Sequence, residues 1–102
     1  MARLVVMYGT PKDAGAFDKY YFERHIPIAK KIPGLRKYEV SRGAIATPAG
    51  AAKYHLIATL FFDDLAAIQN AFASPQGQAT AADLANFATG GGEMFFFEQA
   101  DV

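Results

Sequence analysis

Two histidines are the side chains of this sequence best suited to proton transfer. His25 and His55 are the only histidines in the chain, and imidazole has an ordinary pKa close to neutral pH. A neutral ring can accept a proton at one nitrogen and release one at the other. Cysteine is absent, which excludes thiolate catalysis, disulfides and cysteine-ligated metals. We therefore take His55 and His25 as the candidate catalytic residues.

His25 lies in a helical pattern that also contains a proline. Aromatic and apolar residues recur at three- and four-residue steps from residue 17 and predict a helix to about Lys31. Pro27 has no amide proton, and its ring crowds the carbonyl group of Glu23. We predict that Pro27 breaks the helix, so that the His25 ring turns toward a site or caps the freed carbonyl groups. The capping role is purely structural, and both roles stay open.

His55 lies in the clearest strand of the sequence, residues 53–62. Alternate residues of a strand share a face, so His55 should lie on the face turned away from the helices. A polar ring among apolar side chains is typical of a small-ligand pocket, and pairing of the ring across a dimer is the alternative. The residues expected to bind the ligand are Ile57, Thr59, Phe61, Tyr20 and Tyr8. The tyrosines could equally belong to the core.

Asp83 is a carboxylate that could support a histidine. It comes one helical turn before Phe87, near the inward face of the second predicted helix. It either pairs with His25 or Arg24 across the fold, or faces solvent.

The order of the predicted elements indicates the fold class. The expected strands are residues 3–8, 35–42, 53–62 and 93–99. A helix follows the first strand, and a second follows the third strand, capped by Asp63 or Asp64 and restarted at Ser74-Pro75. The order β-α-β-β-α-β predicts one α+β domain over residues 1–102 with a ferredoxin-like fold. Its sheet has four antiparallel strands, with both helices on one face.

The other face of this sheet is predicted to be too apolar to stay exposed. Ile57 and Phe61 should lie there with Phe95 and Phe97. A second copy of the chain, related by a two-fold axis, is the simplest cover. We therefore expect a homodimer in which two sheets form an α/β barrel, with the ligand pocket inside it.

Composition excludes several classes of function. Ten basic residues balance ten acidic ones, so no nucleic-acid-binding surface is expected. The apolar run before Gly9 is too short for a signal peptide or a membrane span, and we expect a cytoplasmic protein. No phosphate loop or dinucleotide fingerprint is present, and no pair of metal ligands has helical or strand spacing. We expect neither a cofactor nor a metal.

Two motifs resemble a known family. The Tyr-x4-His-x-Pro spacing of Tyr20, His25 and Pro27, together with SPQGQATAADLANF at residues 74–87, resembles the EthD family of the dimeric α/β-barrel superfamily. The resemblance spans almost the whole chain and implies the homodimeric barrel. The family is associated with bacterial degradation of an ether alongside an oxygenase system. Its members are often labelled reductases (oxidoreductases), an activity that would need a nucleotide site.

These observations lead to two functional hypotheses. In the first, the protein binds a small apolar or aromatic metabolite and acts on it by cofactor-free proton transfer, oxygenation or isomerisation. In the second, it is a non-enzymatic accessory protein that binds or shields an intermediate for a partner oxygenase. Only the first hypothesis needs a histidine that titrates.

Overall fold

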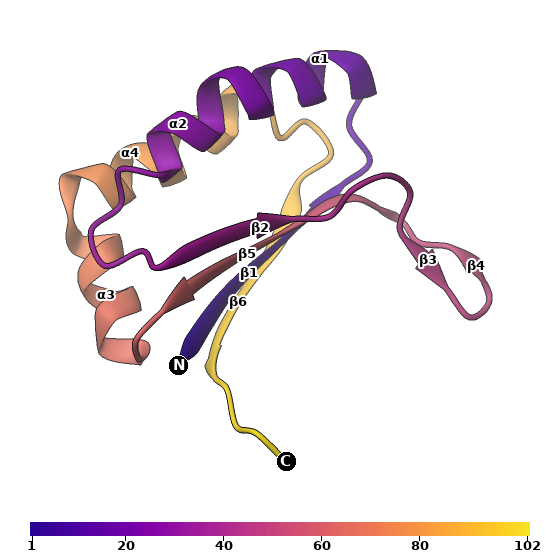
Figure 1. Ribbon diagram of the computed structural model, residues 1–102. Helices are drawn as coiled ribbons and strands as arrows, with labels where there is room; N and C mark the ends of the chain where they lie inside the picture. Colours follow the sequence, from indigo (N-terminus) through magenta and orange to yellow (C-terminus); the bar gives the residue numbers. More distant parts are fainter.

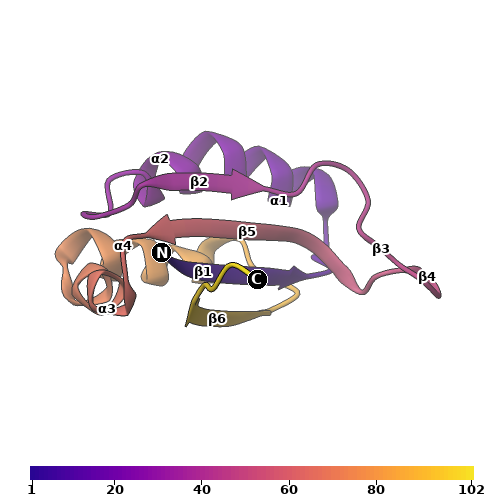
Figure 2. The ribbon, with the colours of Figure 1, turned by 60° about the horizontal axis from the view of Figure 1, so that its bottom comes forward.

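The chain folds into a four-stranded sheet with helices packed on one face. The computed structural model describes residues 1–102. The strands are β1 (Ala2–Gly9), β2 (Lys37–Val40), β5 (Tyr54–Phe62) and β6 (Gly92–Glu98), in the order β2-β5-β1-β6 with every pair antiparallel. Figure 1 shows all the helices on one side of this sheet, and Figure 2 shows the strands side by side. The predicted ferredoxin-like fold is confirmed.

The first helical segment is continuous, so the predicted break at Pro27 is wrong. It consists of α1 (Ala14–Tyr20), the π-helical η1 (Tyr21–His25) and α2 (Ile26–Ala29). The Ile26 amide reaches back five residues to the Tyr21 carbonyl oxygen. This wider turn lies just before Pro27 and accommodates a residue that has no amide proton to donate. The His25 side chain makes no capping hydrogen bond.

The second helical segment restarts as predicted. α3 (Leu65–Ala73) is capped by Asp64, which accepts a hydrogen bond from the Ala67 amide at 2.8 Å. Ser74 then caps α4 (Pro75–Asp83) by accepting from the Gly77 amide at 3.0 Å. Pro75 occupies the first position of α4, where no amide proton is needed. A short 3-10 turn, η2 (Leu84–Asn86), ends the segment.

Buried and partly exposed side chains alternate along β1 and most of β5, and the buried ones form the core under the helices. Leu4 pairs with Leu60 and Val6 with Ala58, and all four side chains are buried. Phe17 from the first helical segment and Ile68 from the second close the core from above. Burying each large side chain contributes about 1.5–3 kcal/mol.

A β-bulge reverses the alternation where β5 begins. Tyr8 pairs with Leu56 but Gly9 pairs with Tyr54, so His55 is an extra residue opposite β1. Tyr54 hydrogen-bonds Glu93, whereas His55 turns toward α1. The prediction that His55 shares a face with residues 57, 59 and 61 is therefore wrong.

The sheet face opposite the helices is uncovered in the single chain. Phe95 is 50% exposed and Phe97 is 45% exposed. The side chains beside them are Arg3, Val5, Met7, Ile57, Thr59 and Phe61. A hairpin formed by β3 (Ala46–Thr47) and β4 (Gly50–Ala51) projects beyond the sheet (Figures 1 and 2).

Candidate functional site

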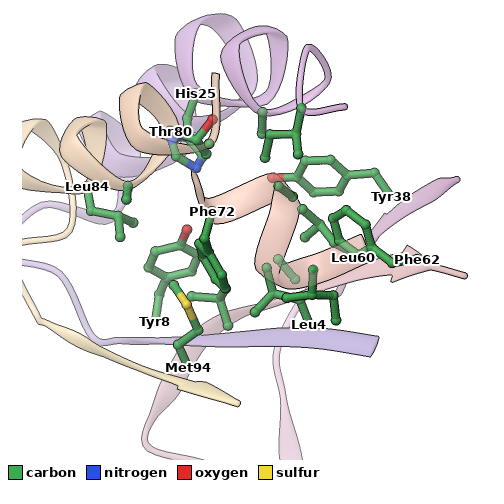
Figure 3. A pocket seen from close by; sticks show the side chains of 18 residues that line it. Leu4, Tyr8, His25, Tyr38, Leu60, Phe62, Phe72, Thr80, Leu84 and Met94 are labelled. Carbon is green, nitrogen blue, oxygen red and sulfur yellow. The ribbon is translucent and has the colours of Figure 1, made fainter. Parts of the chain in front are cut away.

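An apolar cavity lies between the sheet and the helices (Figure 3). Its volume is about 40 Å³, and 15 of its 18 lining residues are hydrophobic. A cavity of this size holds about three water molecules at 10–15 Å³ each, whereas an apolar cavity that takes up benzene has about 150 Å³. A ligand with a six-membered ring must therefore also occupy the space next to the cavity. The polar groups among its lining residues are those of Tyr8, His25, Tyr38 and Thr80. This cavity lies on the helix side of the sheet, whereas the pocket expected from the sequence lies on the opposite face.

The cavity adjoins a groove at the edge of the sheet. The groove has a volume of about 290 Å³ and runs between β6 and η2. Val6, Tyr8, Leu84 and Met94 line both the groove and the cavity. Met94 is 39% exposed, which places it at the boundary between the cavity and solvent.

His25 is the histidine of this cavity, and Asp83 is its partner. The ring is 3% exposed, and its Nδ1 lies 2.9 Å from a carboxylate oxygen of Asp83 at the end of α4. The alternative in which Asp83 pairs with His25 is thus the one that the structure realises. No protein atom hydrogen-bonds the other ring nitrogen, Nε2, and the ring reaches the cavity wall.

The surroundings favour a neutral His25 ring. Burial lowers the pKa of His25 below its ordinary value, and the hydrogen bond and charge of Asp83 offset this only in part. A neutral ring has one N–H, and the Asp83 carboxylate can only accept. The proton therefore lies on Nδ1, which leaves the Nε2 lone pair free to accept a proton near neutral pH.

Asp83 is held by three donors. Tyr20 donates from its hydroxyl at 2.6 Å, the Asn86 amide at 2.9 Å, and His25 to the other oxygen. Burial would raise the pKa of Asp83, but these hydrogen bonds outweigh it and lower the pKa. Asp83 is 6% exposed and charged, so it orients the imidazole and stabilises its protonated form. Phe87 packs on the His25 ring with centroids 4.6 Å apart.

Three tyrosines form a second polar group beside the cavity, of which Tyr8 and Tyr21 are buried and Tyr38 is half-buried. The hydroxyls of Tyr21 and Tyr38 lie 2.6 Å apart, and the rings of Tyr8 and Tyr21 pack edge to face at 5.5 Å. Burial raises the pKa of each of the three phenols. They remain protonated at neutral pH and act there only as neutral hydrogen-bonding groups.

The structure separates the other predicted site residues from this cavity. His55 Nε2 lies 2.7 Å from Asp18 of α1, and its ring meets Phe17 edge to face at 5.0 Å, outside the cavity. Tyr20 does not line the cavity and instead holds Asp83. Of the five residues expected to bind the ligand, only Tyr8 lines the cavity. Ile57, Thr59 and Phe61 lie on the uncovered face of the sheet.

Several residues of the site were missed by sequence reasoning. Asn86 and Tyr38 left no signal, because an amide and a half-buried strand tyrosine occur in many structural roles.

No group of three His, Cys, Asp or Glu side chains is placed to hold a metal ion. None of the helices has the length and apolar run that a membrane crossing requires.

Most of the chain matches one known family. The model of the EthD domain matches residues 10–91. The chain belongs to the EthD family. An uncharacterized 11.0 kDa protein of Rhodococcus erythropolis, from the thcB-thcC intergenic region, is 35% identical over 102 residues, which cover 100% of this chain and 98% of that protein. The resemblance inferred from the Tyr-x4-His-x-Pro spacing and from residues 74–87 is confirmed.

Solved structures extend the similarity to the fold. An ethyl tert-butyl ether (EthD) family protein of Bacillus halodurans superposes with a TM-score of 0.89 and is 34% identical to this EthD chain, with 98% of this chain and 99% of that chain covered. SnoaB of Streptomyces nogalater, a cofactor-independent oxygenase, superposes with a TM-score of 0.70 at 17% identity, covering 99% and 94%. At that identity, the similarity to SnoaB shows the shared fold alone.

Proposed function

We propose that this EthD protein binds a small apolar or aromatic molecule in the cavity and transfers a proton on it through His25, without a cofactor. The observation that supports this most strongly is the His25–Asp83 pair, which leaves Nε2 free on the wall of an otherwise apolar cavity. A general base needs a neutral nitrogen within reach of the ligand and a group that stabilises the protonated ring. Here the nitrogen is Nε2 and the stabilising group is Asp83.

Proton transfer explains this arrangement better than shielding of an intermediate does. An accessory protein that only binds an apolar molecule needs an apolar wall and no ionisable pair. A buried carboxylate is costly unless it is paired and hydrogen-bonded, and this one is supported by donors from three side chains. Proton abstraction would also prepare a ligand for reaction with dioxygen, the kind of chemistry named for SnoaB on a similar fold.

The test uses a small enolisable ketone as the probe. Cyclohex-3-enone is a single six-membered ring that would occupy the cavity together with the adjoining groove, and its isomerisation to cyclohex-2-enone needs only proton transfer. We expect the wild-type protein to accelerate this isomerisation and His25→Asn to lose about a hundredfold or more of that acceleration. The asparagine amide keeps a donor where Nδ1 stands, so its contact with Asp83 can persist while the base is lost.

The matched control is His55→Asn. It removes the other histidine, which lies outside the cavity, and should leave the rate unchanged. Equal rates for wild type and His25→Asn would contradict the proposed function. Loss of rate in His55→Asn alone would move the chemistry to the other histidine.

We also propose that two copies of the chain associate through their uncovered sheet faces. Phe95 and Phe97 stand about half-exposed on this face, and the guanidinium of Arg3 lies 4.0 Å from the centre of the Phe61 ring. Arg3 Nη1 is buried without a hydrogen-bond partner in the single chain, an unusual state that a second copy could relieve. Soluble monomers rarely expose a large apolar patch, and such patches mark interaction sites.

A further inference from the structure

We propose that Tyr8 is the hydrogen-bond donor that receives the ligand's oxygen, and that the ligand is an enolisable carbonyl compound about the size of one ring. This inference rests on the proposed function of His25 and deepens it. Tyr8 and His25 supply two polar groups to a cavity whose walls are otherwise largely hydrocarbon. A ligand that interacts with both groups presents an acidic hydrogen to His25 Nε2 and a hydrogen-bond acceptor to the Tyr8 hydroxyl.

The geometry brings the two groups to the same part of the cavity. Figure 3 shows the Tyr8 hydroxyl and the His25 ring pointing toward one another from opposite walls, Tyr8 from the sheet and His25 from the helix. Both rings pack on Phe87, at 5.5 Å for Tyr8 and 4.6 Å for His25. Phe87 does not line the cavity itself, so it supports both rings from behind the cavity wall.

The Tyr8 hydroxyl is the free donor of the tyrosine cluster. Tyr38 also lines the cavity, but its hydroxyl is engaged with that of Tyr21 at 2.6 Å. Tyr8 is 2% exposed, and its hydroxyl interacts with that of Tyr21 as an acceptor, which leaves its own proton free for donation. A ligand oxygen in the cavity would give the Tyr8 O–H group an acceptor.

The chemistry of this pair suits enolisation. His25 Nε2 takes the proton from a carbon next to the carbonyl group, and the C–H electron pair becomes a carbon–carbon double bond. The carbonyl π electrons move onto the oxygen, where the Tyr8 O–H stabilises the developing negative charge. Return of the proton from Nε2 to another carbon of the conjugated system completes an isomerisation and leaves the His25 imidazole neutral again. No electron acceptor or other reactant is needed.

Phenol and toluene form a matched pair of probes for the donor. Phenol resembles the dienol of a cyclohexenone, while toluene has the same shape without the oxygen. We expect Tyr8→Phe to weaken phenol binding about tenfold or more, because the bound hydroxyl loses its donor. Toluene affinity should stay within about twofold, because the ring that packs on Phe87 is retained. NMR titration measures both affinities.

The control variant replaces a tyrosine that lies outside the cavity. Tyr54→Phe removes a phenol outside the cavity, where it hydrogen-bonds Glu93, and should change neither affinity. Unchanged phenol binding in Tyr8→Phe would overturn the role of Tyr8, while His25 could still act as the base. If the wild type bound neither phenol nor toluene, the cavity itself would not accept a ligand of this class, and the inference and the proposed function would fail together.

Discussion

Replacing Gly77 with alanine tests how closely the two helices over the cavity approach each other. A Cβ atom built on Gly77 of α4 would lie 1.8 Å from the Ala71 carbonyl oxygen of α3, whereas contacts below 3.0 Å are essentially never observed. The colliding atom belongs to the backbone, so no side-chain rotation can relieve the overlap. α4 must shift as a unit, and it holds Asp83 at one end and several residues of the cavity wall.

Two opposing effects decide whether Gly77→Ala raises or lowers the free energy of unfolding. Alanine favours a helix over glycine by about 1 kcal/mol, whereas forcing an extra methyl group into a packed site costs about 1–3 kcal/mol and sometimes more. Because the clash is with backbone, we take the upper end of that range and expect Gly77→Ala to lose about 2 kcal/mol net. Urea denaturation followed by circular dichroism should show a lower midpoint with an unchanged slope.

Gly15 provides the matched control. It also lies in a helix, α1, but a Cβ there would meet only the Asp13 carboxylate oxygen at an ordinary 3.5 Å. Gly15→Ala should therefore be neutral or gain up to about 1 kcal/mol. If Gly77→Ala were as stable as the wild type, or more stable, the close approach of α3 and α4 would be refuted.

Three further predictions follow from the site and from the uncovered sheet face. Since Asp83 partly offsets the effect of burial, Asp83→Asn should lower the pKa of His25 further; an unchanged NMR titration would show that the pair is not coupled. The folded-state pKa of His25 lies below the unfolded value of about 6.5, so the free energy of unfolding should be highest above that pH and should fall as the pH drops toward the folded-state pKa. His25→Asn should reduce this pH dependence. An identical pH dependence in wild type and His25→Asn would contradict the lowered pKa. Phe97→Glu places a carboxylate beside Arg3, its pairing partner across the strands, so the chain should stay folded while sedimentation changes from twice the chain mass to the mass of one chain; a wild-type protein that already sediments as a monomer would refute the dimer.

The fold could be predicted because its signals are local and repeated. Residues 56–62 alternate without interruption, so the face of each side chain follows from parity alone. Ser74 and Pro75 mark a helix start through the chemistry of one cap and one missing amide proton. Such signals need no knowledge of what lies elsewhere in the chain.

The bulge at His55 could not be predicted from alternation. It depends on pairing with the end of β1, where Gly9 lies against Gly90: a Cβ on Gly9 would be 2.4 Å from the Gly90 carbonyl oxygen. One extra residue is enough to turn His55 to the other face of the sheet. The residue whose pairing skips His55 is Gly9, which is far from it along the chain.

The expected location of the pocket followed from the same parity argument. With His55 placed on the uncovered face, the pocket was predicted between two sheets. The cavity between the sheet and the helices contains His25, and its partner Asp83 is 58 positions away in the sequence. The sequence placed Asp83 near an inward face but left its partner open, because only the packing of α4 against the first helical segment brings the two side chains together.

The protonation state of His25 is the most direct test of the central claim. Long-range 1H–15N NMR distinguishes the two neutral tautomers of a histidine ring from its charged form, and it follows each nitrogen through a pH titration. We predict that His25 is neutral at pH 7 with its proton on Nδ1, that it titrates below the ordinary histidine pKa, and that the Nε2 signal shifts when phenol binds. A proton on Nε2, or a ring that is charged at pH 7, would contradict this claim.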